Sequence, residues 1–307
     1  MKLQRVFTAA FNNLLPACYQ KYHACRLAQT SKRLDLCAAQ WAHILHLVKD
    51  DSVRDKVCLE IGSGWVLSHA LILYLLGAKR IIATDIHPYA QPQSLDYAVG
   101  KAVPSIIRDI LSPFNEHQDI RRRLDILKDR NFSFDCLKSL GIEYIAPIDL
   151  AKEKLRHPVD LIYSFSVLEH VPTTVIGALL LNLESMLSEN GVMLHCIHME
   201  DHNNIQENPF EFLQKSLQDY GEDLQPVRGN RIRASGWKKL FAALGESESG
   251  VIYEWQRLDK PLPPLIDKSI EFIDEHDLRT SHLGIYVQKL PRRASSGVVR
   301  QGEVLLK

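Results

Sequence analysis

Residues 57–65 are VCLEIGSGW, and this stretch decides how the rest of the sequence is interpreted. An apolar run carries an acid and ends in two glycines before a second apolar segment, Val66 to Leu76. This order predicts a buried strand, a tight turn and a helix whose N-terminus faces a ligand. A dinucleotide fingerprint needs a third glycine where Leu67 stands, so the stretch argues against a pyrophosphate site.

Apolar runs continue the alternation of strands and helices along the chain. Strands are predicted at 57–61, 80–85, 142–146, 159–165, 192–199, 251–255 and 283–287. Helices are predicted at 34–48, 68–76, 120–140, 172–189, 210–217 and 266–273, and after Ser235 as a cap. We therefore predict an α/β fold with a Rossmann-like, doubly wound, mostly parallel seven-stranded sheet whose last strand is antiparallel.

Three regions are predicted: an N-terminal helical cap over 1–52, a main domain over 53–290 and a peripheral tail over 291–307. The main domain has an insertion at about 88–140, because a single crossover helix needs fewer residues. We predict that this insertion is a helical lid over the site. Its run of three arginines at 121–123 either contacts an anionic substrate or forms a solvated face. Such runs in proteins are more often solvated faces.

Composition limits the kinds of partner. The chain has 307 residues, of which 46% are hydrophobic, so it can bury a sizeable core. Its net charge is zero, and we expect no nucleic-acid partner. The six cysteines include no CxxC pair, which predicts reduced thiols and a cytoplasmic location. No apolar run approaches the roughly 18 residues of a membrane span.

The first 34 residues carry six Lys or Arg and no Asp or Glu. Apolar residues recur in them at helical spacing. A peripheral membrane contact through a basic amphipathic helix and a transit peptide are two interpretations. We favour the third, a cap helix that packs on the main domain with its basic face in water.

Three acids mark the ends of predicted parallel strands: Glu60 and Asp85 lie at the ends of 57–61 and 80–85, and Asp149 follows 142–146. All three would lie at the carboxyl edge of the sheet, where open α/β folds bind ligands. Like charges exclude a pyrophosphate there. The three positions suit an ammonium group, a pair of ribose hydroxyls and an adenine amine. S-adenosylmethionine has these three parts, and we predict it as the cofactor.

The same segments resemble the successive motifs of class I S-adenosylmethionine-dependent methyltransferases. The resemblance rests on 59–64, 83–86, 148–150 and 159–171, and residues 167–171, VLEHV, are the most specific part. They are similar to the helix start after strand four in the small-molecule methyltransferases. Residues 198–202 and 230–235 look like those of bacterial methyltransferases associated with surface glycans.

The resemblance implies roles for single residues. Glu60 would orient the methionine amino group, Asp85 would hold the ribose with Ile86 packed on the adenine, and Asp149 would hold the adenine amine. The implied cofactor-binding set is Glu60, Gly62, Ser63, Gly64, Asp85, Ile86, Asp149, Ser164, Phe165 and Ser166.

Two residues depart from the family pattern. Val66 stands where a third glycine is frequent, and Trp65 is bulky where small residues are common. They either reshape the cofactor pocket or close it. The rival hypotheses are therefore a non-catalytic, methyltransferase-like binding or scaffold protein and, less favoured, a nucleotide-dependent oxidoreductase.

Methyl transfer to a hydroxyl benefits from a general base, and histidine suits that role near neutral pH. His170 follows the fourth predicted strand and His202 follows the fifth, so both are predicted bases. The predicted acceptor is a hydroxyl, or less favourably an amine, of a small molecule or glycan.

Four further residues are predicted to contact the substrate: His198, Asp201, Arg231 and Arg233. The alternative for the two arginines is ion pairing with the acidic segment 200–223. His198, Asp201 and His202 could together ligate a divalent metal, but their spacing is no standard zinc signature, and we predict no metal site from it.

Overall fold

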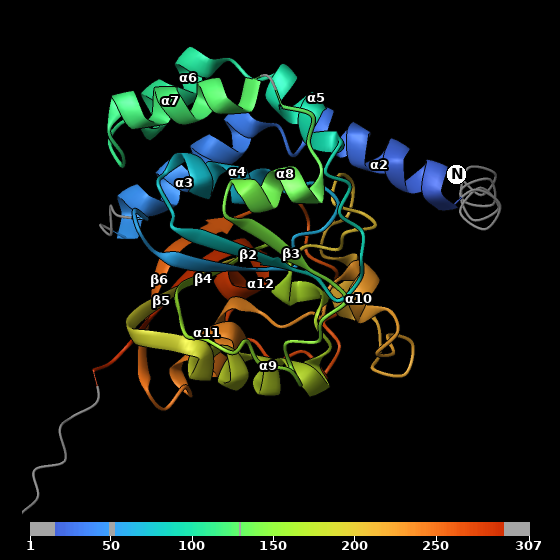
Figure 1. Cartoon of the computed structure of the whole chain (residues 1–307). Helices are drawn as coiled ribbons and strands as arrows, with labels where there is room; N and C mark the ends of the chain where they lie inside the picture. The colour runs from blue at the N-terminus through green and yellow to red at the C-terminus, as the bar shows by residue number, and fades with distance from the viewer. Residues whose placement is uncertain (1–15, 49–52, 129, 292–307) are drawn as a thin grey trace, which may run out of the picture.

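The computed structural model describes residues 16–48, 53–128 and 130–291. Its centre is one seven-stranded sheet of order β3-β2-β1-β4-β5-β7-β6 with helices on both faces (Figure 1). The strands are β1 Val57–Ile61, β2 Arg80–Thr84, β3 Ile142–Ile145, β4 Val159–Phe165, β5 Leu187–His198, β6 Ser247–Gln256 and β7 Thr280–Lys289.

Strands β1 to β5 run parallel, and β7 runs antiparallel to both β5 and β6. The predicted doubly wound, mostly parallel sheet is confirmed. The strand order reverses at β1, which pairs with β2 on one side and β4 on the other. Crevices for ligands form at such a switch point, outside the carboxyl ends of the strands.

The sheet separates two hydrophobic cores. One core holds Trp41, Leu71 and Tyr163 under the helices α3 to α8, and the other holds Ile162, Leu180 and Trp237 under α9 and α11. The helices are α2 Pro16–Thr30, α3 Leu34–Val48, α4 Ser68–Leu75, α5 Ser94–Gly100, α6 Pro104–Leu111, α7 His117–Lys128, α8 Phe134–Ser139, η1 Leu168–His170, α9 Thr173–Met186, η2 Glu211–Gln214, α10 Gln225–Arg228, α11 Ala234–Ala242 and α12 Glu275–Arg279.

The N-terminal region begins, as far as it is described, with α2 and α3. The α3 residue Trp41 is fully buried and meets Tyr163 of β4 edge-on, with ring centroids 4.9 Å apart. Residues 1–15 lie outside the described residues, so the membrane-contact and transit-peptide interpretations stay predictions. No described helix is long and apolar enough to cross a membrane.

The insertion after β2 forms four short helices. α6 packs on α3 and α7 packs on α4, so these two form an outer layer, whereas α5 packs on α2 (Figure 1). That the insertion at about 88–140 serves as a lid over the site stays a prediction. The predicted helix over 120–140 is divided, because the Ser133 side chain accepts a hydrogen bond from the Cys136 N–H and starts α8.

One other predicted helix boundary and one predicted helix are wrong. α9 ends at Met186 because Leu187 already pairs with Val159 of β4, and the turn at 190–191 lies inside β5. No helix forms at 266–273. There the Asp267 N–H donates to the carbonyl of Leu213, which ties the segment to η2.

Candidate functional site

The turn after β1 is left-handed at two glycines. Gly62 has φ +65° and Gly64 has φ +64°, a conformation that other residues rarely adopt. An added Cβ at Gly62 would lie 2.6 Å from the Val167 methyl groups, whereas an added Cβ at Gly64 would lie 4.0 Å from the carbonyl oxygen of Gly62. The turn is therefore packed against residue 167 on one side and open beside Gly64.

Asp85 lies beside this turn, at the end of β2. Its two carboxylate oxygens accept hydrogen bonds from the backbone N–H groups of Gly64 (2.8 Å) and His87 (2.9 Å). Each oxygen keeps a further lone pair that can accept a ligand hydroxyl. The next residue, Ile86, is an apolar side chain that is 57% exposed. The predicted ribose and adenine contacts are therefore neighbours at this edge.

Glu60 is a buried acid, 4% exposed, and no described residue gives its Oε2 a hydrogen bond. Burial raises its pKa to about 7, while the charge of Lys32 and the facing hydroxyls of Ser63 and Tyr163 lower it in part. Lys32 lies in the turn between α2 and α3, so the N-terminal region contributes a charge to the site. A buried carboxylate without a full partner favours a cationic ligand.

Asp149 follows β3 and is partly exposed. Its carboxylate pairs with the Lys152 ammonium (2.8 Å) and accepts from the Ala151 N–H (3.0 Å). The bond from Lys152 is the main cause that lowers the pKa of Asp149. It is ionised near neutral pH, as an acceptor for an adenine amine must be.

The end of β4 corrects one predicted contact. Ser164 is fully buried, and its Oγ lies 2.8 Å from Nδ1 of His195. Successive side chains of a strand point to opposite faces, so the Ser164 side chain faces the core of α9 and α11. Its neighbour Phe165 stacks on His69 with centroids 4.1 Å apart. Ser166 is exposed at the strand end with φ +53°.

Trp65 packs between two elements that border the turn. Its indole stacks on Tyr89 at 4.4 Å between centroids and 5° between planes, and His23 of α2 meets it edge-on at 4.7 Å. The backbone N–H of Gln91 donates to the Trp65 carbonyl. Trp65 thus joins α2 to the segment after β2, and Val66 is buried in the core.

A histidine–carboxylate cluster lies at the same edge, formed by Glu169, His170, His198, Glu200, His202 and His282. The rings of His170 and His202 are 4.4 Å apart, those of His198 and His202 are 4.7 Å apart, and those of His198 and His282 are 4.2 Å apart. Val167, which packs on Gly62, directly precedes η1 and its residues Glu169 and His170. The cluster therefore adjoins the glycine turn.

The two predicted bases, His170 and His202, come together in this cluster. Burial lowers the pKa of both, and for His202 the value is about 3, with the charges of His170 and His198 as further causes. Burial raises the pKa of Glu169 to about 8. An efficient general base has a pKa near the working pH, so His202 is poorly suited to that role.

The other side of the cluster is a paired network. Nε2 of His198 lies 2.6 Å from Glu200, and Nη1 of Arg257 lies 2.8 Å from the other oxygen of Glu200. His282 stacks on His198 because β7 pairs with β5 and sets the two residues opposite each other. Four members of this network and its surroundings were not predicted as site residues: Glu169, Glu200, Arg257 and His282. Glu169 and Glu200 carried a signal, since they lie in the segments 167–171 and 198–202 on which the family resemblance rests.

Three of the four residues predicted to contact the substrate bond to other groups of the protein. Asp201 is fully buried in a two-pronged ion pair with Arg228. Arg231 donates to the carbonyls of Phe212 and Lys215. Arg233 is 1% exposed and donates to the carbonyls of Met199, Leu278 and Thr280. Of the four, only His198 joins the cluster, and neither arginine forms the predicted ion pair with the acidic segment.

Asn230 fixes the position of η1. Its backbone N–H donates to the Glu169 carbonyl (2.6 Å), and its side-chain Nδ2 donates to the carbonyls of Leu168 (3.0 Å) and Val171 (2.9 Å). The side chain is 5% exposed. Asn230 therefore holds η1, which carries Glu169 and His170, in place.

No protein-family model matches the chain, and no curated protein matches its sequence. Among solved structures the chain is similar to magnesium protoporphyrin IX methyltransferase (ChlM) from Synechocystis PCC 6803 with bound SAH, at 14% identity and a TM-score of 0.45 over 92% of this chain and 98% of that one. It is also similar to DhpI in complex with SAH, at 15% identity and a TM-score of 0.44 over 90% of this chain and 95% of that one. A third similar structure is N-methyltransferase NodS from Bradyrhizobium japonicum WM9, at 17% identity and a TM-score of 0.39 over 86% of this chain and 90% of that one. The fold is defined by the strand order above and not by these distant likenesses.

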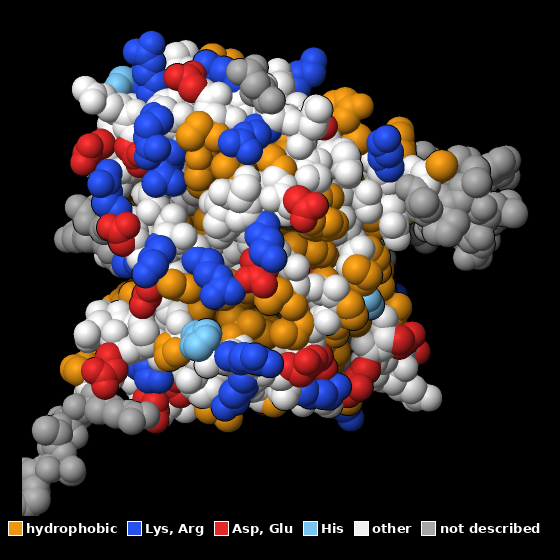
Figure 2. Space-filling view, viewed as in Figure 1, with side chains coloured by type: hydrophobic (Ala, Val, Ile, Leu, Met, Phe, Trp, Pro, Cys, Tyr) orange, Lys and Arg blue, Asp and Glu red, His pale blue; other side chains and the backbone are white. Residues whose placement is uncertain are grey.

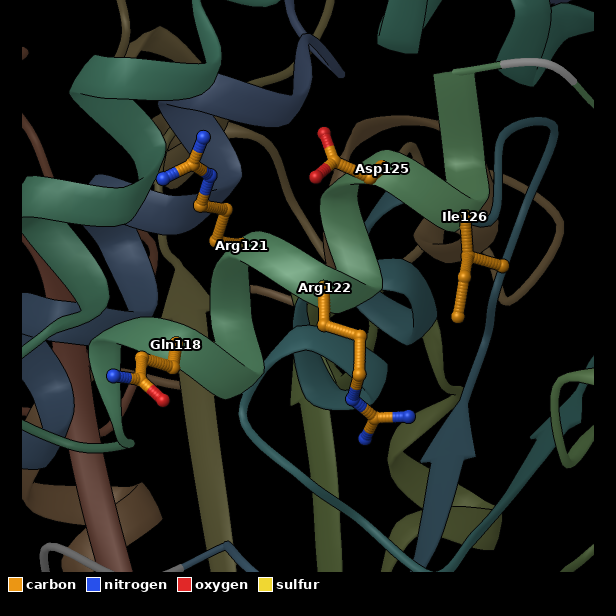
Figure 3. Close-up of a pocket in the computed structure, with 5 residues that line it drawn as sticks. All are labelled: Gln118, Arg121, Arg122, Asp125 and Ile126. Atoms are coloured by element: carbon orange, nitrogen blue, oxygen red, sulfur yellow. The ribbon is translucent and has the colours of Figure 1, made fainter.

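A surface hollow of about 490 Å³ lies on α7, away from the carboxyl edge. Its lining residues all come from α7, and their side chains point in different directions (Figure 3): Gln118, Arg121, Arg122, Asp125 and Ile126. Arg122 and Arg123 both pair with Asp119. The face with α6 and α7 shows many Lys and Arg side chains interspersed with acids (Figure 2). Arg121 and Arg122 are exposed and fit the solvated-face interpretation, whereas Arg123 is partly buried and donates to the carbonyl of Tyr74.

Proposed function

We propose that the chain is an S-adenosylmethionine-dependent methyltransferase that acts on a hydroxyl of a small molecule or glycan. The observation that carries this proposal is the buried carboxylate of Glu60, whose Oε2 has no hydrogen bond from any described residue, beside a left-handed glycine turn at the switch point of the sheet. An ammonium group is the ligand that such a carboxylate requires.

The residues present fit this cofactor. Glu60 would meet the ammonium, the open side of Gly64 would let the cofactor pass close to the backbone, and Asp85 would accept the ribose hydroxyls. The exposed Ile86 would cover one face of the adenine, and Asp149 would accept its amine.

When bound, the cofactor supplies an electrophilic methyl group on a sulfonium. The residues of this chain have to align an acceptor with that group and exclude water. The acceptor oxygen would bond to the methyl carbon as the carbon–sulfur bond breaks, and the products would be the methylated acceptor, S-adenosylhomocysteine and the proton of the hydroxyl. We assign activation of the acceptor hydroxyl to the histidine–carboxylate cluster, because it adjoins the turn through Val167.

Titration calorimetry of the purified chain with S-adenosylhomocysteine tests the proposal. We expect one site per chain, with an affinity that falls roughly tenfold per pH unit below pH 7. The reason is that the Glu60 carboxyl has a pKa of about 7 when free and must be ionised to pair with the ammonium. The useful window is about pH 5.5–7.5, because the ligand's own amine loses its proton near pH 8.

The matched control is Glu60→Gln, which keeps the side-chain shape and removes the titration. We expect weaker binding that no longer varies with pH in this window. A wild-type affinity that is flat with pH would contradict the role of Glu60. No heat with either S-adenosylmethionine or S-adenosylhomocysteine would favour a non-catalytic methyltransferase-like protein, and tight binding of NAD would favour an oxidoreductase.

Replacement of Asp85 by Ala is expected to weaken S-adenosylhomocysteine binding by ~1.5–3 kcal/mol, since two charge-assisted hydrogen bonds to the ribose are lost. The same calorimetric titration measures this change, and thermal unfolding should show that the variant is folded. Asp149→Ala is the comparison, with a smaller loss expected because Asp149 is more exposed and already paired with Lys152. Unchanged affinity of the Asp85 variant would rule out the assigned ribose contact.

A further inference from the structure

Glu169, His170 and His202 have the geometry of ligands to one ion. One ligand atom from each lies within 4.8 Å of the other two. His202 Nε2 is 3.6 Å from Glu169 Oε1, which is long for a hydrogen bond. Two ligands of one tetrahedral Zn²⁺, each bound at about 2.0–2.1 Å, are separated by roughly 3.3 Å. The observed spacing is close to that value.

The same atoms are buried without partners. Glu169 is 2% exposed, and neither of its carboxylate oxygens has a hydrogen bond from any described residue. Nδ1 of His170 and Nε2 of His202 are also unpartnered within the described chain. The Ser166 hydroxyl and the backbone N–H of His198 face the carboxylate without reaching hydrogen-bonding geometry. A buried carboxylate and two imidazole nitrogens left open in this way cost stability unless an ion satisfies them.

A backbone group lies beside each imidazole: that of Pro226 beside His170 and that of His198 beside His202. Histidines that bind metals typically donate their second ring N–H to such a group, which fixes the ring and its tautomer. The unpartnered Nε2 of His202 faces Glu169 Oε1.

The rival ligand sets are already satisfied. His198, Glu200 and His282 also lie within ligand distance of one another, but Glu200 is held by His198 and Arg257. Asp201, which the sequence placed with His198 and His202, is held by Arg228. The unsatisfied atoms single out the set Glu169, His170 and His202.

We propose that Glu169, His170 and His202 bind one divalent transition-metal ion, with an open position for an oxygen ligand. Two histidines and one carboxylate with an open position form the ligand set of catalytic Zn²⁺ and of Fe²⁺ oxygenases. The role of the ion rests on the proposed function: it would hold the acceptor hydroxyl and acidify it, and the proton would pass to water. His170 and His202 then act as ligands rather than as bases.

The test uses the full-length chain without a purification tag, treated with a chelator and dialysed. Zn²⁺ is added, and bound metal is measured by elemental analysis and by competition with a chromophoric chelator. Co²⁺ is the spectroscopic probe, since four-coordinate Co²⁺ with nitrogen and oxygen ligands has intense visible bands. We expect one Zn²⁺ per chain, a visible Co²⁺ spectrum and a rise in the thermal midpoint on metal addition.

Glu169→Gln and His202→Ala should each weaken Zn²⁺ binding by at least about 100-fold, since each removes a direct ligand. His282→Ala and the exposed His46→Ala are the matched controls and should bind Zn²⁺ within about threefold of wild type. Circular dichroism establishes that each variant is folded, and Glu169→Gln is isosteric should His202→Ala unfold. Wild-type chain with no bound Zn²⁺, or loss of binding in His282→Ala but not in Glu169→Gln, would overturn the proposal.

The two proposals fail separately. Zn²⁺ binding with no S-adenosylhomocysteine binding would leave the metal site standing and remove the methyltransferase. Binding of S-adenosylhomocysteine with no Zn²⁺ binding would leave the methyltransferase and remove the metal site.

Discussion

Arg233→Met is expected to lower the free energy of unfolding by about 3–5 kcal/mol, measured by urea denaturation. The guanidinium is fully enclosed and donates to the carbonyls of Met199, Leu278 and Thr280, which lie just after β5, in α12 and at the start of β7. Methionine has a similar volume and no donor, so these buried carbonyls would lose their partners.

A matched exposed arginine separates this effect from loss of charge. Arg122 is 65% exposed and pairs with Asp119 on the surface of α7, and Arg122→Met should leave the denaturation midpoint nearly unchanged. Equal midpoints for the Arg233 and Arg122 variants would show that the carbonyl network contributes little.

Asn230→Ala is expected to lower the free energy of unfolding by about 2–4 kcal/mol, since the carbonyls of Leu168 and Val171 lose their donor. It should also weaken Zn²⁺ binding about tenfold, because η1 carries Glu169 and His170. Denaturation and chelator competition measure the two effects. The exposed Asn208→Ala is the control. A destabilised variant with wild-type Zn²⁺ affinity would mean that Asn230 supports the fold and not the site.

The positions of Glu60 and Asp85 at the carboxyl edge of the sheet could be predicted because their signals are local in the sequence. An apolar run followed by an acid marks a parallel strand and its carboxyl end together, as at Glu60 and Asp85. Ser164 was misassigned although β4 was predicted with the correct ends, because a strand's pattern does not tell which of its faces borders a ligand. Its partner His195 lies on a neighbouring strand.

The cluster half could not be predicted in full, since its residues meet through pairing across the sheet. No motif of the sequence surrounds His282, and only the antiparallel register of β5 and β7 sets it opposite His198. The arginines 231 and 233 show a related limit. An arginine suits a carboxylate ligand and a ring of backbone carbonyls equally well, and sequence does not distinguish them. The helix predicted at 266–273 failed for a similar reason, since Ile266, Ile270 and Ile273 repeat at helical spacing while the backbone bonds to η2.

The contact between Val167 and Gly62 has a consequence for substrate choice. Val167 fills the space that a side chain at residue 62 would need, so the glycine turn and η1 are packed directly against each other. Under the proposed function, the distance from the methyl donor to the acceptor would then depend on the volume of this one valine. A smaller or larger residue at 167 would alter the reach between donor and acceptor, and this position is a natural place to retune which acceptor is accommodated.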